Sequence, residues 1–177
     1  MKVITIFLIA VSLSMDAFSL ALIYGTQSIS KKDKTLISLI VGIYHFVMPL
    51  IGLGIGLFIT NKIIINTNIL VGIILSLIAV EMIISSFKEK EEKFLLSIPG
   101  YLLFGLSVSI DSLTTGIGFP AITDYYILSA LTFSITSLIF TFLGLNLGNI
   151  LNKKYGKIST LIGGIILLII GIIYIFK

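Results

Sequence analysis

Ser12-Leu-Ser-Met-Asp16-Ala-Phe-Ser19 lies inside the first long apolar run of the chain, and its pattern returns as Ser107-Val-Ser-Ile-Asp111-Ser-Leu-Thr114. Each copy reads hydroxyl, apolar, hydroxyl, apolar, aspartate, and Asp111 follows Asp16 by 95 residues. Acidic residues are rare inside membrane-spanning segments and usually mark functional sites there. A repeated acid in apolar surroundings therefore indicates a duplicated unit that carries a carboxylate into the membrane.

The duplication extends into the segments that follow each aspartate. Ile51-Gly52-Leu53-Gly54-Ile55-Gly56 matches Leu143-Gly144-Leu145-Asn146-Leu147-Gly148, which begins 92 residues later. Gly72-Ile-Ile-Leu75 matches Gly164-Ile-Ile-Leu167 at the same separation. Because Ile and Leu dominate the chain, the aspartates and glycines carry the comparison. The glycine spacings are small-xxx-small patterns, which allow helices to approach closely.

The composition is that of a membrane protein. Of the 177 residues, 57% are hydrophobic and 11% are charged, which leaves too few polar groups to cover a soluble domain. A helix needs about 20 apolar residues to cross a bilayer, and six stretches qualify: 4–24, 36–59, 69–87, 94–118, 125–147 and 158–176. The sequence therefore predicts an all-α membrane protein with six transmembrane helices.

The number of spans in each copy decides how the two halves are related. Three is odd, so tandem copies must enter the membrane in opposite directions. We expect a first three-helix repeat over 1–87, a charged cytoplasmic linker over 88–93 and a second, inverted three-helix repeat over 94–177. Inverted repeats are typical of secondary transporters, whose sites lie near the bilayer midplane where the repeats meet.

Lysines predict the orientation. All twelve basic residues are lysines, and nine of them fall in the first, third and fifth connections: Lys31, Lys32, Lys34, Lys88, Lys90, Lys93, Lys153, Lys154 and Lys157. The positive-inside rule places those connections in the cytoplasm and both termini outside. Short lysine clusters between apolar runs are topology signals rather than a surface that follows phosphates. The expected partners are the lipid bilayer and an ion, with no nucleic acid, and a homo-oligomer is left open.

Asp16 and Asp111 need compensation for their charge. An ionised carboxylate inside a membrane costs about 2.5 kcal/mol or more, and no lysine lies within the six stretches. Each aspartate must be protonated, face water or neutralise a bound cation. Two carboxylates balance one divalent ion. The alternative is a pair of protonated aspartates that tie helices together by hydrogen bonds.

Hydroxyl groups accompany both aspartates. Residues three or four apart share a helix face, so Ser12 lies with Asp16, and Ser107 and Thr115 lie with Asp111. Oxygen donors suit hard divalent ions such as manganese and magnesium. The chain has no cysteine and so no thiolate site for a softer metal.

His45 is the only histidine, and it falls near the middle of the second stretch. Pro49 cannot donate a hydrogen bond to the His45 carbonyl, so that oxygen is freed beside an imidazole. Manganese accepts imidazole nitrogen as well as oxygen, whereas a packed histidine beside a kink is the alternative. The predicted metal ligands are accordingly Asp16, Asp111, Ser12, Ser107, His45 and Thr115.

Glu81 is a third acid within the spans, in the inner half of the third. Its side chain can snorkel to the cytoplasmic surface or take part in the ion path. Both readings stay open.

These motifs resemble those of the MntP-type manganese exporters. The resemblance rests on Ser14-Met15-Asp16-Ala17-Phe18 followed by Gly25, on Met48-Pro49-Leu50-Ile51-Gly52, and on Ser109-Ile110-Asp111-Ser112-Leu113 followed by Gly116 and Gly118. It covers nearly the whole chain, including its length, six spans and duplication. A sporulation-associated membrane family is similar in these motifs, but its inter-half segment is longer than the six residues 88–93.

The resemblance implies manganese efflux across the cytoplasmic membrane of a bacterium, with Asp16 and Asp111 in the ion path. Manganese would be the transported substrate, and no cofactor is implied. Two residues depart from the pattern. His45 stands where relatives often carry an acid or an amide, and Glu81 belongs to no family motif.

Three functions are compatible with these observations. The first and most favoured is a secondary exporter of a divalent cation, with manganese(II) as the preferred ion. No G-x-x-x-x-G-K-[ST] motif is present to bind ATP, and an aspartate that releases its cation should take up a proton, which favours proton exchange. The second is an exporter of a small amino compound. The third is a structural or sporulation membrane protein that transports nothing. An enzyme is not expected, because one histidine and no cysteine provide no nucleophile–base pair.

Overall fold

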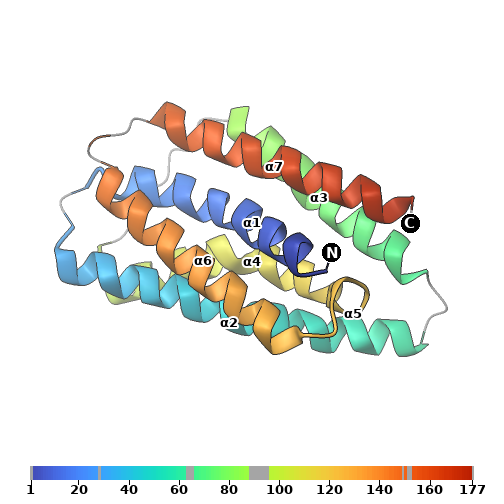
Figure 1. Ribbon diagram of the computed structural model, residues 1–177. Helices are drawn as coiled ribbons and strands as arrows, with labels where there is room; N and C mark the ends of the chain where they lie inside the picture. Colours follow the sequence, from blue (N-terminus) through green and yellow to red (C-terminus); the bar gives the residue numbers. More distant parts are fainter. Residues whose placement is uncertain are drawn as a thin grey trace.

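The computed structural model describes residues 2–27, 29–62, 66–87, 96–148, 150 and 153–176, and the regular structure in these ranges is entirely helical (Figure 1). The helices are α1 (Lys2–Tyr24), α2 (Lys31–Lys62), α3 (Thr67–Phe87), α4 (Ile98–Ile117), α5 (Phe119–Ile122), α6 (Tyr126–Leu147) and α7 (Lys153–Ile175). The all-α class predicted from the sequence is confirmed. The predicted linker 88–93 and the predicted start of the fourth span at residue 94 lie outside the described residues.

Five of the described helices are long and apolar enough to cross a membrane, namely α1, α2, α3, α6 and α7. The protein is therefore a multi-pass membrane protein. Helix α4 has 20 residues but is not among the five, because Ser107, Asp111 and Thr114 are among the polar residues that lower its hydropathy. Helix α5 was not predicted from the sequence. It is a single turn that begins beside Pro120, and so short a helix has no apolar periodicity to indicate it.

Caps explain where the helices begin. The Ser30 hydroxyl oxygen accepts the Asp33 N–H at 3.1 Å and donates to the Asp33 carboxylate at 2.7 Å, a reciprocal arrangement close to a capping box. This cap starts α2 at Lys31, five residues before the predicted start of the apolar run. Ser97 caps α4 by accepting the Gly100 N–H at 3.4 Å, with a proline in the first turn, where a missing N–H costs nothing.

Helix α2 packs directly against the backbone of α4 through two glycines. A Cβ atom on Gly52 would overlap the Leu113 carbonyl, and one on Gly56 would overlap the Ile117 carbonyl. Small residues allow helix backbones to approach this closely. Since the contacts ascend together along both helices, α2 and α4 run parallel to each other.

Helix α6 packs on α1 in the same manner. A Cβ atom on Gly144 would lie 2.8 Å from the Phe18 carbonyl oxygen, and one on Gly148 would lie 2.5 Å from the Leu22 carbonyl oxygen. Again the contacts ascend together, so α1 and α6 are parallel. They form a four-helix group with α2 and α4, because α2 also packs on α6.

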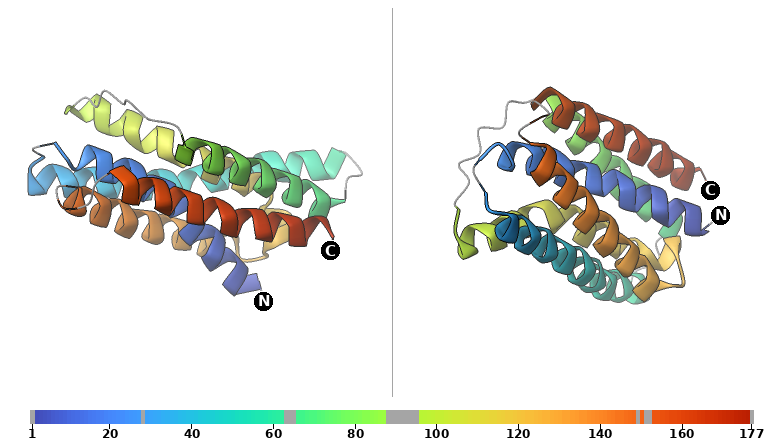
Figure 2. Two further views of the ribbon diagram at one scale, coloured as in Figure 1. Left: turned by 90° about the horizontal axis from the view of Figure 1, so that it is seen from above. Right: turned by 60° about the vertical axis from the view of Figure 1, so that its left-hand side comes forward.

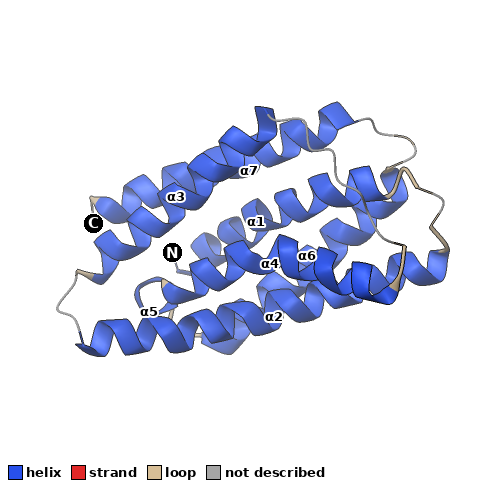
Figure 3. Ribbon diagram, turned by 180° about the vertical axis from the view of Figure 1, so that it is seen from behind, coloured by secondary structure: helices blue, strands red, loops and turns tan. Residues whose placement is uncertain are grey.

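Helices α3 and α7 form an antiparallel pair at one side of this group (Figures 2 and 3). Gly72 of α3 lies against Gly171, whereas Gly164 lies against Ala79. Helix α7 also packs along α1, where a Cβ on Gly163 would lie 2.6 Å from the Ser12 carbonyl oxygen. Helix α3, by contrast, touches α4 at few points.

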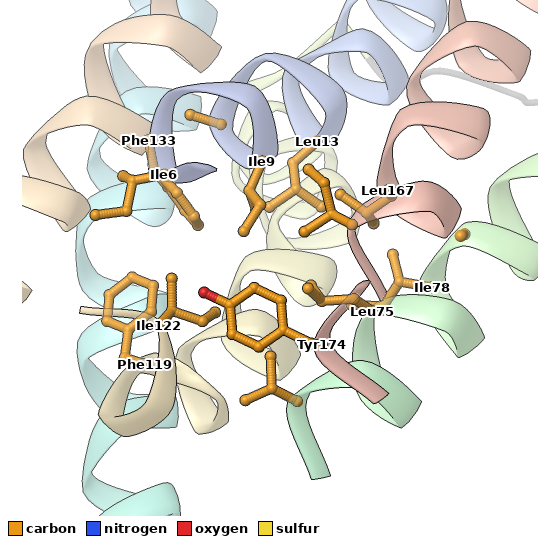
Figure 4. Packing of buried hydrophobic residues seen from close by; sticks show 14 of the residues in the cluster. Ile6, Ile9, Leu13, Leu75, Ile78, Phe119, Ile122, Phe133, Leu167 and Tyr174 are labelled. Atoms are coloured by element: carbon orange, nitrogen blue, oxygen red, sulfur yellow. The ribbon is translucent and has the colours of Figure 1, made fainter. Parts of the chain in front are cut away.

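The two ends of the bundle differ in chemistry. The described ends of the chain, in α1 and α7, lie at the same end (Figure 1), which we call the terminal end. Lys31, Lys32 and Lys34 on the first turns of α2 and Lys157 on α7 lie at the opposite end, which we call the lysine-rich end. An apolar cluster fills the terminal end between α1, α3, α5, α6 and α7 (Figure 4). This terminal cluster includes Ile6, Ile9, Leu75, Ile78, Met82, Phe119, Ile122, Phe133 and Tyr174.

Candidate metal site

A cavity of about 470 Å³ lies where α3 stands away from α4, with α1 at its back. Its polar lining residues are Asp16, Glu81, Ser85, Ser107, Asp111 and Thr114. Its apolar lining residues are Leu20, Leu77, Ile78, Met82 and Ile110. Three carboxylates from three different helices therefore face one space inside a bundle of membrane-length helices.

The structure brings together three of the six predicted ligands. Asp16 on α1 and Asp111 and Ser107 on α4 all line this cavity. Both aspartates are partly buried. The Ser107 hydroxyl donates to the Phe104 carbonyl at 2.8 Å, so its oxygen lone pairs can still accept a hydrogen bond or bind a cation.

Ser12 does not line the cavity. It is fully buried on α1, where its hydroxyl donates to the Leu8 carbonyl at 2.8 Å. Its backbone carbonyl lies against Gly163 of α7. Ser12 and Ser107 occupy the same position in the two copies of the motif, so the different packing of α7 and α3 separates their environments.

His45 and Thr115 are also buried away from the cavity lining. The His45 Nδ1 lies 3.0 Å from the Val41 carbonyl oxygen; a carbonyl can only accept, so Nδ1 carries the hydrogen. His45 Nε2 and Thr115 Oγ1 have no hydrogen-bond partner within the described part of the chain. A role as metal ligands stays a prediction for Ser12, His45 and Thr115.

Three polar lining residues were not among the predicted ligands: Glu81, Ser85 and Thr114. The sequence did indicate Glu81, because an acidic residue within an apolar span usually marks a functional site. Thr114 continues the hydroxyl stripe beside Asp111. Ser85 had no signal. Among the described residues, no group of three or more His, Cys, Asp and Glu side chains is close enough to hold a metal ion, so the carboxylates share a space without closing on one point.

The terminal cluster forms the apolar floor of this cavity. Ile78 and Met82 belong both to the cavity lining and to the terminal cluster, and Ile78 stands beside Leu75 and Leu167 in Figure 4. The cavity lining on α3 reaches Ser85, two residues before the helix ends at Phe87 at the lysine-rich end. The cavity therefore extends toward the lysine-rich end and is bordered by packed apolar side chains toward the terminal end.

A bundle of long apolar helices with an acidic cavity is typical of multi-pass membrane proteins of the ion-transporter class. The chain belongs to the MntP family of manganese efflux pumps: the family described as "Putative manganese efflux pump" matches residues 27–175. The resemblance found in the motifs is thereby confirmed.

Curated relatives match over almost their whole length. The Bacillus pumilus protein named "Putative manganese efflux pump MntP" is 32% identical over 176 residues, which cover 99% of this chain and 96% of that protein. The one from Halalkalibacterium halodurans is 33% identical, covering 97% and 95%. The one from Oceanobacillus iheyensis is 34% identical, covering 99% and 97%. No solved structure matches the chain.

Proposed function

We propose that this chain exports manganese(II) from a bacterial cell across the cytoplasmic membrane as a secondary transporter, with Asp16 and Asp111 as the carboxylates that bind the cation. One observation carries the assignment of the site: the two repeated aspartates, 95 residues apart, line one cavity. Two negative charges in a poorly polar environment neutralise one divalent cation. The names of the relatives support manganese as that cation.

The proposed fold behind this function is two inverted three-helix repeats, 1–87 and 94–177, with α4 as the fourth of six spans. The glycine contacts support it. Gly52 meets Leu113, and Gly144 meets Phe18; the two glycines are 92 residues apart and their two partners 95, the same separations as in the sequence repeat. Helix α4 also runs parallel to α2, a helix of spanning length.

One interface departs from this two-fold relation. Helix α7 packs along α1, whereas their counterparts in the other repeat, α3 and α4, are separated by the cavity. Exchanging the two arrangements would close α3 onto α4 and open α7 from α1, which is how inverted repeats alternate access. Ser12, now covered by α7, would then line a cavity as Ser107 does in the present conformation.

The proposed orientation has the lysine-rich end in the cytoplasm and both termini outside, which makes the present cavity face inward. The chain contains no cysteine, so single cysteines can report on it without background. We expect an impermeant maleimide to label an Asn66→Cys variant in intact cells, because exposed Asn66 connects α2 and α3 at the terminal end. A Lys32→Cys variant should react only after permeabilisation. Labelling in the reverse order would overturn the orientation.

The proposed mechanism needs no cofactor and no nucleotide. Cation release leaves carboxylates that take up protons in a poorly polar cavity, so an inward proton gradient would drive the return of the empty carrier. If the rate of manganese transport in membrane vesicles did not change with an imposed pH gradient, this coupling would be excluded.

The function itself is tested by expressing the chain in a manganese-sensitive bacterium and measuring intracellular manganese by elemental analysis. We expect the chain to lower intracellular manganese several-fold relative to cells with an empty vector. Inside-out vesicles then test the cargo, because excess magnesium or a small cationic amine should compete poorly with manganese. No change in manganese despite protein in the membrane would remove the proposal and favour another cargo or a structural role.

A further inference from the structure

Glu81 is a third carboxylate in the same cavity as Asp16 and Asp111. It lies on α3, the helix opposite the one that carries Asp111, six residues before the helix ends at Phe87. It is exposed, whereas both aspartates are partly buried. Glu81 therefore occupies the open side of the cavity, between the lysine-rich end and the two aspartates.

The cavity lining argues against a purely peripheral role for Glu81. A carboxylate directed at lipid would be costly in this part of a span, but one that borders a cavity keeps its hydration. In a cleft with apolar walls, a fixed charge concentrates ions of the opposite sign and speeds their entry. The residues beside Glu81 in the lining are Leu77 and Ile78, so apolar side chains border its charge.

The second repeat has no equivalent carboxylate. Gly72 and Leu75 correspond to Gly164 and Leu167, 92 residues later, and the same separation pairs Glu81 with Ile173. The two central aspartates are duplicated, but this acid is present only in α3. The two similar halves therefore differ in charge at this position, with an acid in α3 and an isoleucine in α7.

We infer that Glu81 captures the divalent cation at the mouth of the cavity and passes it to Asp16 and Asp111. This role rests on the proposed function. An acid on the loading side raises the local cation concentration there, and an isoleucine at the matching position on the release side does not hold the cation back. Glu81 thereby favours loading at low cytoplasmic manganese without being part of the central site.

Manganese uptake into inside-out vesicles, measured against manganese concentration, tests this role with Glu81→Gln. The substitution removes the charge and keeps the shape of the side chain. We expect the half-saturating manganese concentration to rise about tenfold, within the range by which a charged cleft concentrates its ion, while the maximal rate stays within about twofold. Added salt should weaken uptake less in this variant than in the wild type, because screening has less charge to act on.

Two matched variants separate capture from structure. Glu81→Asp keeps the charge and should restore a half-saturating concentration close to that of the wild type. Asp33→Asn removes a carboxylate at the same end of the bundle, where Asp33 is bonded to Ser30 and does not line the cavity; its uptake should match the wild type.

The outcomes distinguish this role from the function on which it rests. If the wild type moves no manganese, the proposed function fails and the role of Glu81 fails with it. If the wild type transports and Glu81→Gln has an unchanged half-saturating concentration, only the capture role is overturned. A lost maximal rate at an unchanged half-saturating concentration would also overturn it, because it would place Glu81 in the translocation step.

Discussion

Replacing Asp16 and Asp111 together by asparagine should abolish manganese efflux. Asparagine has nearly the shape of aspartate but no charge, so the cavity would lose its two partly buried carboxylates and keep only the exposed Glu81, whose single charge cannot neutralise a divalent cation inside the membrane. Cells that express the double variant should hold as much manganese as cells with an empty vector, measured by elemental analysis. Each single variant should lose at least tenfold in efflux at low manganese, because only one of the two proposed binding carboxylates then remains.

The same substitutions are not expected to unfold the protein. A neutral amide is easier to insert into a membrane than a carboxylate, and Asp16 and Asp111 line a cavity rather than a packed core. The amount of each variant in the membrane, measured by immunoblot, should therefore equal that of the wild type. Equal efflux by the wild type and the double variant would show that the cation does not bind at these aspartates.

The helices of this protein could be predicted from the sequence because each is a long apolar run in a chain with few polar residues. The sequence is less informative where apolar length is not the signal. Helix α2 begins early because Ser30 and Asp33 cap a polar first turn, and α5 is a single turn beside Pro120. Helix α4 was expected to span by its length and position, although its polar stripe leaves its composition short of a typical span.

The candidate site was predictable only to the extent that the repeat is symmetric. Ser12 and Ser107 have the same motif context, so the sequence assigns them the same role. In the structure, α7 covers Ser12 while α3 leaves Ser107 on the cavity. In one conformation the two copies of the motif have different neighbours, although their sequences are similar. The sequence alone does not indicate which copy lines a cavity. The role of Glu81 was ambiguous for a different reason. The sequence does not show that α3 lies beside the two aspartates, and only that placement puts Glu81 in the same cavity.

Gly52→Ala should destabilise the protein more than Gly54→Ala, although the two glycines are two residues apart on one helix. A Cβ on Gly52 would overlap the backbone carbonyl of Leu113, which cannot move aside without shifting α4. Overpacking of this kind costs about 1–3 kcal/mol or more. A Cβ on Gly54 meets no atom within 4 Å apart from its own stretch of helix, and alanine there gains up to about 1 kcal/mol of helix propensity. Thermal unfolding in detergent should show a lower midpoint for Gly52→Ala and an unchanged or higher midpoint for Gly54→Ala.

The repeat turns this comparison into a test of the architecture. Gly144 stands in α6 where Gly52 stands in α2, and a Cβ on Gly144 would lie 2.8 Å from the Phe18 carbonyl oxygen. Gly144→Ala should therefore lower the unfolding midpoint as Gly52→Ala does, because each glycine allows the close packing of its own parallel helix pair, α1 with α6 and α2 with α4. If Gly144→Ala were as harmless as Gly54→Ala, the pairs α1–α6 and α4–α2 would not be energetically equivalent. The proposed inverted repeat would then lose the contact that supports it most directly.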